Sequence, residues 1–205
     1  MLASPSRVEE AERMTADEFF EFAPETQKAE LIDGVMIVAP PPLDIHEREQ
    51  GFLFTLIRLY VEMFALGEVR GSRMAVRLSD TDVFEPDVLF VARERAKIIQ
   101  ERGIFGAPDL VVEILSASTA PYDRGDKFHA YERAGVGELW LIDPYGPAGT
   151  EFFQRRGEGL QPVMPDAGGW LTSQALQGFR LNVKWLWPQE KFVSIREALE
   201  AMGAA

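Results

Sequence analysis

The fold is decided by the segment Leu110-Val111-Val112-Glu113-Ile114-Leu115, which carries one carboxylate inside an otherwise apolar run. Such a run is typical of a β-strand that is covered on both faces of its sheet. The pattern after it predicts a helix over residues 123–134, with Gly135 at its end, and a strand over Glu138–Ile142. A strand, a helix and a strand in this order fit a crossover connection within a mixed sheet. The sequence therefore predicts an α/β fold.

Further elements extend this unit in both directions along the chain. Thr15 and Glu18 form a capping pattern before a helix expected at 16–22, and Asp33-Gly34 marks a hairpin between strands at 29–32 and 35–38. The remaining expectations are a capped helix that follows Asp44 and closes at Gly67, strands at 69–78 and 86–91, a hairpin around 151–155, an apolar run at 179–187 and a helix at 194–202. Together these elements predict one sheet flanked by helices.

Composition bounds the class of protein. The chain has 205 residues, of which 46% are hydrophobic and 26% charged, as in an ordinary globular domain. We expect a single domain over residues 1–205, with a flexible tail at about the first 13 residues. A membrane span needs about 20 mostly apolar residues in a row, and the sequence has no such run. The absence of cysteine excludes disulfides, thiolate metal sites and cysteine nucleophiles. We therefore expect a soluble, cytoplasmic protein.

The net charge of −12 argues against a protein that coats nucleic acid, because neutralising phosphates normally requires a basic surface. Much of the acidic excess lies in the first 50 residues, however, and basic side chains cluster later in the chain. One such cluster contains Arg70, Arg73 and Arg77. We hypothesise that these three arginines line a nucleic-acid-binding cleft, and the alternative is ordinary solvated surface charge.

Two acidic residues stand in apolar surroundings. Asp87 follows Pro86 and opens a strand, and Glu113 lies inside the run described above. A buried carboxylate requires a compensating cation or hydrogen bonds. For either acid alone, a structural ion pair or a water-facing edge position is a sufficient explanation. If the two strands are neighbours, the carboxylates converge, and a hard divalent cation such as Mg²⁺ or Mn²⁺ is then the natural occupant.

A lysine completes this group of candidates. Asp123, Lys127 and Tyr131 are spaced four residues apart and therefore share one face of the predicted helix. If that face packs over the strand that carries Glu113, the ammonium group of Lys127 reaches the carboxylates. The alternative is an exposed helical ion pair between Asp123 and Lys127, which adds little to stability.

Four segments together resemble the Uma-two family, a large bacterial group of restriction-endonuclease-like proteins. They are AELIDG at 29–34, EPDVLFV at 85–91, PDLVVEILSAST at 108–119 and YDRGDKFHAYERAGVGELWLIDP at 122–144. The resemblance covers the chain from about Met14 to Trp187. It implies a restriction-endonuclease-like mixed sheet flanked by helices. It also implies similarity to the PD-(D/E)XK nucleases, in which two acidic residues of the motif bind a metal ion.

The resemblance assigns roles to individual residues. It implies that Asp87 and Glu113 are the metal ligands. The tripeptide Glu113-Ile114-Leu115 lacks the usual lysine, and in this family the lysine is thought to have moved to the next helix, which implies Lys127. Glu30 matches the acidic residue of the family's first hairpin motif and is expected to complete the site.

Two further positions are common in the family without an assigned role, and both are retained as candidate catalytic residues. These are His46 and Tyr131. One local departure is Ala117, where the family often has proline. This change affects no proposed ligand.

These features predict an endonuclease that hydrolyses phosphodiester bonds in DNA with Mg²⁺ or Mn²⁺ as its cofactor. The resemblance further implies that the protein forms a homodimer. Lys127 would orient the attacking water or stabilise the charge that develops on phosphorus. The alternative is a non-catalytic nucleic-acid-binding or assembly module that retains the nuclease fold. The acidic net charge favours the module, whereas the presence of Asp87, Glu113 and Lys127 favours the enzyme.

Overall fold

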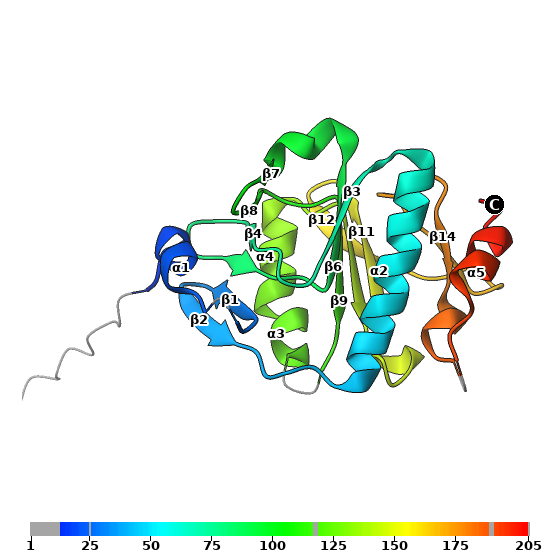
Figure 1. The fold of residues 1–205 in the computed structure, drawn as a ribbon, viewed down its shortest axis with the longest axis horizontal. Helices are drawn as coiled ribbons and strands as arrows, with labels where there is room; N and C mark the ends of the chain where they lie inside the picture. The colour runs from blue at the N-terminus through cyan, green and yellow to red at the C-terminus, as the bar shows by residue number, and fades with distance from the viewer. Residues whose placement is uncertain (1–12, 25, 117–118, 189–190, 205) are drawn as a thin grey trace, which may run out of the picture.

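The computed structural model describes residues 13–24, 26–116, 119–188 and 191–204. Nearly all of the expected N-terminal tail lies outside the described residues, and so does Ala117. Within these ranges the chain forms a mixed α/β fold of two six-stranded sheets and a two-stranded sheet, flanked by helices (Figure 1). No helix in the described part of the chain has both the length and the apolar character that crossing a bilayer demands.

The main sheet has the strand order β12-β11-β10-β9-β6-β3. Its strands are β3 (Gly67–Gly71), β6 (Val88–Ala92), β9 (Leu110–Ile114), β10 (Glu138–Ile142), β11 (Glu151–Arg156) and β12 (Gly159–Val163). β9 and β10 pair in parallel and are connected through α3 (Ala120–Arg124) and α4 (Asp126–Ala134). This confirms the expected crossover unit. On its other side β9 pairs antiparallel with β6.

The second sheet has the order β2-β1-β5-β4-β8-β7. Its strands are β1 (Ala29–Ile32), β2 (Val35–Val38), β4 (Val76–Arg77), β5 (Val83–Phe84), β7 (Ile99–Gln100) and β8 (Gly103–Phe105). The predicted hairpin β1–β2 is confirmed: Asp33 and Gly34 turn the chain with positive φ angles of 48° and 76°. The prediction of one sheet was wrong. The segment 69–78 supplies β3 to the main sheet and β4 to the second, because the chain turns between them at Arg73, where φ is 78°.

The helix boundaries agree with the sequence patterns in part. α1 (Ala16–Phe22) begins with the expected capping box of Thr15 and Glu18. α2 (Asp44–Phe64) begins at the residue that was expected to cap it, and Leu43 precedes it without a side-chain cap. α2 also ends before Gly67, because Ala65 takes the left-handed conformation with a φ of 50°.

The remaining elements follow the crossover unit or interrupt it. The helix expected at 123–134 is divided at Gly125 into α3 and α4; a Cβ at Gly125 would lie 2.8 Å from the carbonyl oxygen of Pro121. The rest are η1 (Arg93–Ile98), η2 (Pro147–Gly149), β13 (Trp170–Thr172), β14 (Arg180–Asn182), η3 (Val183–Leu186) and α5 (Ile195–Ala201).

The main sheet is covered on both faces, as Figure 1 shows. On one face α2 packs Leu56 into a core that includes Val112 of β9. On the other face Tyr131 of α4 shares a second core with Val111. Because successive residues of a strand point to opposite faces, Glu113 lies on the same face as Val111. The fold thereby directs the one carboxylate of β9 toward α4.

Candidate active site

Two buried carboxylates meet where β6 and β9 lie side by side. Val88 pairs with Val112 across these strands, so Asp87 comes opposite Glu113 by continuation of the register. The backbone N–H of Ile114 donates a hydrogen bond of 2.8 Å to Oδ2 of Asp87. Both side chains are only 2–3% exposed. The strands that carry Asp87 and Glu113 are therefore neighbours, and they bring the two predicted metal ligands together.

Asp87 is held by a lysine and a histidine. The Nζ atom of Lys28 lies 2.9 Å from Oδ1, and Nε2 of His46 lies 3.2 Å from Oδ2. Burial by itself would raise the pKa of Asp87, but Lys28, His46 and the hydrogen bond from Ile114 outweigh it and hold the pKa well below its usual range. Burial would likewise lower the pKa of His46, but the contact with Asp87 raises it. Asp87 is therefore ionised at neutral pH.

Glu113 lies between the main sheet and α4. Its Oε1 atom is 2.7 Å from Nζ of Lys127 and accepts a hydrogen bond of 2.5 Å from the hydroxyl of Tyr131. Burial raises the pKa of Glu113 to about 8; the nearby carboxylate of Asp123 adds to this rise, and Lys127 opposes it. Ionising Glu113 at neutral pH is therefore costly unless a further cation approaches it.

Lys127 joins three carboxylates in one buried network. Besides Glu113, its ammonium group contacts Oε1 of Glu30 at 2.9 Å and Oδ1 of Asp123 at 3.1 Å. The side chains of Lys127 and Asp123 are 2% and 3% exposed. An exposed helical pair of these two residues is thus excluded. Burial alone would lower the pKa of Lys127, but Glu113 and Glu30 keep it well above its usual value, so the ammonium stays charged.

Glu30 reaches this network from the second sheet. It lies in β1, where its Oε1 atom also accepts a hydrogen bond of 2.9 Å from the backbone N–H of Glu85. The hairpin β1–β2 therefore brings a third acidic side chain next to those of β6 and β9. This is the position that the family's first hairpin motif implied for Glu30.

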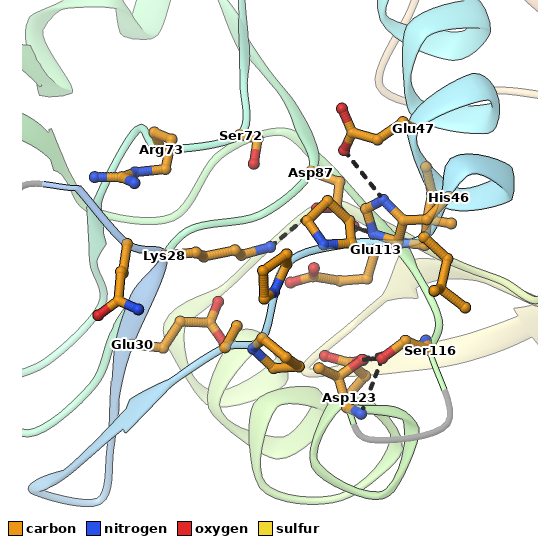
Figure 2. A pocket seen from close by; sticks show the side chains of 18 of the residues that line it. Lys28, Glu30, His46, Glu47, Ser72, Arg73, Asp87, Glu113, Ser116 and Asp123 are labelled. Atoms are coloured by element: carbon orange, nitrogen blue, oxygen red, sulfur yellow. Dashed lines mark hydrogen bonds and ion pairs between the residues drawn. The ribbon is translucent and has the colours of Figure 1, made fainter.

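These side chains line an open pocket of about 610 Å³. Figure 2 shows the side chains of Lys28, Asp87, His46 and Glu113 directed toward one part of this pocket, with Glu30 facing them from β1. Pro40, Pro41 and Pro42 also line the pocket, together with Leu43, which directly precedes α2. The buried acids are therefore accessible to a ligand that enters from solvent.

The expected arginine cleft is not present as predicted. Of the three arginines, only Arg73 lines the pocket, and its Nε atom lies 3.5 Å from Glu85. Arg77 forms ion pairs with Asp17 and Asp80, and Arg70 pairs with Glu68. The three residues separate because the chain turns between β3 and β4, which belong to different sheets. Their role in binding nucleic acid stays a prediction that rests on Arg73 alone.

Lys28 is the residue of the site that sequence reasoning missed. It pairs with Asp87 across a separation of 59 residues, so no local pattern indicates the contact. One signal was available: Lys28 directly precedes the strand predicted at 29–32 and lies two residues before Glu30, so in extended backbone the two side chains share a face. If Glu30 belongs to the site, Lys28 is the next candidate.

The pocket suits a hard divalent cation by its chemistry. Carboxylates outnumber lysines and arginines among its lining residues, and carboxylate oxygens are the ligands that Mg²⁺ and Mn²⁺ prefer. Across the residues that the structure describes, no group of three or more histidine, cysteine, aspartate or glutamate side chains is gathered as a metal site. In this arrangement ammonium groups lie next to both carboxylates, that of Lys28 at Asp87 and that of Lys127 at Glu113.

Comparison with known proteins identifies the family. Residues 16–184 match the model of the Uma2 family, which carries the description "Putative restriction endonuclease". The chain belongs to the Uma2 family. The resemblance stated from the four sequence segments is thereby confirmed. A search of curated proteins gave no match.

A solved structure supports the fold of this Uma2 protein. It comes from Anabaena variabilis ATCC 29413 and is described as a putative nuclease belonging to DUF820. The two structures align with a TM-score of 0.65 and 19% sequence identity, covering 92% of this chain and 99% of the other. At this identity the likeness shows the fold alone, and it confirms the prediction of a nuclease-like mixed α/β fold.

Proposed function

We propose that this Uma2 protein is an endonuclease that hydrolyses phosphodiester bonds in DNA with Mg²⁺ or Mn²⁺ as its cofactor. One observation carries the proposal. Asp87 and Glu113 converge from adjacent strands at an open pocket, and the buried ammonium group of Lys127 lies 2.7 Å from Glu113. Paired carboxylates beside a lysine would supply a cation site and a fixed positive charge, and both contribute to metal-assisted phosphodiester hydrolysis.

The proposed chemistry divides between the cation and the chain. A divalent cation on Asp87 and Glu113 would polarise a phosphodiester oxygen and lower the pKa of a bound water. Lys127 would orient that water or stabilise the charge developing on phosphorus. Its three carboxylate contacts fix the ammonium group in place before substrate arrives, which is the preorganisation that electrostatic catalysis requires.

Two further residues would position the machinery. Tyr131 donates its hydroxyl hydrogen to Oε1 of Glu113, which leaves the Oε2 atom able to bind a cation. His46 contacts Oδ2 of Asp87 and so fixes the rotation of that carboxylate. We therefore assign both residues a positioning role rather than a direct part in the reaction.

The substrate and the assembly belong to the same proposal. The family description of restriction endonuclease supports DNA as the substrate. We also propose a homodimer, in which two copies with one site each would cleave both strands of a duplex in one encounter. A cytoplasmic location, which the sequence predicts, belongs to the same proposal.

A non-catalytic module is the second candidate, and one observation favours it. Lys28 already neutralises Asp87 without a metal ion, so the buried acids have an internal structural explanation. The net charge of −12 also opposes broad contact with phosphates.

Cleavage of supercoiled plasmid distinguishes the two candidates. Purified protein is incubated with Mg²⁺, Mn²⁺ or a chelator, and nicked and linear products are quantified. We expect metal-dependent cleavage that falls on the order of 100-fold in Glu113→Gln and in Lys127→Met, as expected when one preorganised charge is removed. Asp126→Asn is the matched control, because Asp126 is exposed on the same helix as Lys127.

Thermal unfolding verifies that each variant is folded. Equal cleavage by Glu113→Gln and wild type would contradict the proposed site. Absence of cleavage by wild type on plasmid, single-stranded DNA and RNA alike would favour the module.

A further inference from the structure

The ammonium group of Lys28 lies among three of the site's carboxylates. It is 2.9 Å from Oδ1 of Asp87. Burial by itself would lower the pKa of Lys28, but the negative charges of Asp87, Glu30 and Glu113 outweigh it and raise the pKa above its usual value. Lys28 is therefore positively charged, and the carboxylates that attract it are the same ones that would attract a metal ion.

The contacts of the two proposed ligands differ between their oxygen atoms. Oδ2 of Asp87 accepts from the N–H of Ile114 and contacts His46, whereas Oδ1 contacts Lys28 alone among the described residues. Glu113 shows the same asymmetry. Its Oε1 atom contacts Lys127 and the Tyr131 hydroxyl, and no contact of Oε2 occurs within the described part of the chain. Oδ1 of Asp87 therefore has fewer protein contacts than Oδ2 and is the oxygen better able to bind a metal ion. It is also the oxygen that Lys28 contacts.

The two lysines of the site are held very differently. Lys127 is 2% exposed and contacts three carboxylates, so burial and three ion pairs hold its ammonium group in place. Lys28 is 23% exposed and lines the open pocket, and within the described residues its ion pair is with Asp87 alone. Its backbone is fixed, because its carbonyl oxygen accepts a hydrogen bond of 2.9 Å from the N–H of Ala39. The side chain of Lys28 can therefore leave Asp87 without any change in the hairpin.

We propose that Lys28 is a displaceable counterion of Asp87: a divalent cation takes its place on Oδ1, and the released ammonium group then binds the phosphate of the substrate. The inference rests on the proposed function, because it requires a metal ion on Asp87 and a phosphodiester in the pocket. Two positive charges on one carboxylate oxygen repel each other, so the metal ion and Lys28 exclude one another there. A phosphate that enters the pocket offers Lys28 a new anionic partner.

Calorimetric titration with Mn²⁺ alone, without substrate, tests the displacement. We expect Lys28→Met to bind Mn²⁺ on the order of tenfold more tightly than wild type, because no ion pair has to be broken; tenfold corresponds to about 1.4 kcal/mol. Lys28→Arg retains the charge and should bind Mn²⁺ as wild type does. Arg73→Met is the matched control: it removes a positive charge from the pocket lining without touching Asp87, and its affinity should change less than about threefold.

Binding of a phosphorothioate duplex that resists hydrolysis tests the transfer to phosphate. In the presence of Mn²⁺, log affinity falls with log salt concentration. This fall should be less steep in Lys28→Met than in wild type, by a slope of about 0.9, the value for one lost phosphate contact.

The outcomes separate this inference from the proposed function. Wild type that binds no Mn²⁺ would overturn both. If wild type binds Mn²⁺ and Lys28→Met binds it with equal or lower affinity, the displacement alone is overturned. If the salt slope of Lys28→Met equals that of wild type, the transfer of Lys28 to phosphate is overturned.

Discussion

Replacing Lys127 with methionine removes the charge at the centre of the buried network and keeps the length of the side chain. Three carboxylates then lose their common cation: Glu30 at 2.9 Å, Glu113 at 2.7 Å and Asp123 at 3.1 Å. Breaking a buried pair by removing one partner costs about 3–5 kcal/mol. Protonation of Glu113 offsets part of this loss, because the pKa of Glu113 already lies near 8. We therefore expect Lys127→Met to lower the free energy of unfolding by about 3 kcal/mol.

Urea unfolding in the presence of a chelator measures this change. A loss of about 3 kcal/mol corresponds to a decrease in melting temperature of roughly 6–12 °C for a domain of this size. The double variant Lys127→Met with Glu113→Gln should recover at least about 1 kcal/mol, because the uncompensated carboxylate is then neutral. Lys97→Met is the control for an exposed lysine and should change stability by less than about 0.5 kcal/mol.

A cost of less than about 1 kcal/mol for Lys127→Met, with no recovery on adding Glu113→Gln, would contradict this expectation. In that case the ammonium group is not the cation that compensates the buried acids.

Four further predictions concern buried side chains of the protein and the binding of Mg²⁺. Tyr131→Phe removes a hydrogen bond to a buried carboxylate and should cost about 1.5–3 kcal/mol in urea unfolding. Glu113 binds its proton more tightly in the folded chain, with a pKa of about 8 against 4.5, so chelator-treated wild type should lose stability as pH rises from 4.5 to 8, and Glu113→Gln should lose less. Glu49 is 1% exposed and burial raises its pKa to about 8; Glu49→Gln should therefore raise the free energy of unfolding above pH 8, with no gain below pH 4.5. Mg²⁺ at a hundred times its dissociation constant should stabilise wild type by about 2.7 kcal/mol in thermal unfolding, and Asp87→Ala should abolish that gain.

The parts of the site that follow local periodicity could be predicted from the sequence. Alternation along β9 places Glu113 on one face, and the four-residue spacing of Asp123, Lys127 and Tyr131 places all three on one side of the chain. The spacing holds although Gly125 divides the helix, because α3 and α4 still direct Asp123 and Lys127 to the same carboxylates.

The parts that depend on contacts between distant segments could not be predicted. Lys28 meets Asp87 only because the hairpin β1–β2 folds against the ends of β6 and β9, and no local pattern records that packing. The division of residues 69–78 between two sheets depends on a turn at Arg73, a residue type that rarely takes a positive φ. The same turn places Arg70 and Arg77 in different sheets, so that of the three arginines only Arg73 lines the pocket.

The most direct test of the central claim is a crystal structure of the wild-type protein grown with Mn²⁺, in which anomalous scattering locates the ion. We expect one ion between the carboxylates of Asp87 and Glu113, with the ammonium group of Lys28 withdrawn from Asp87. A structure that shows no ion there, with Lys28 still paired to Asp87 at a saturating Mn²⁺ concentration, would contradict the metal-dependent mechanism.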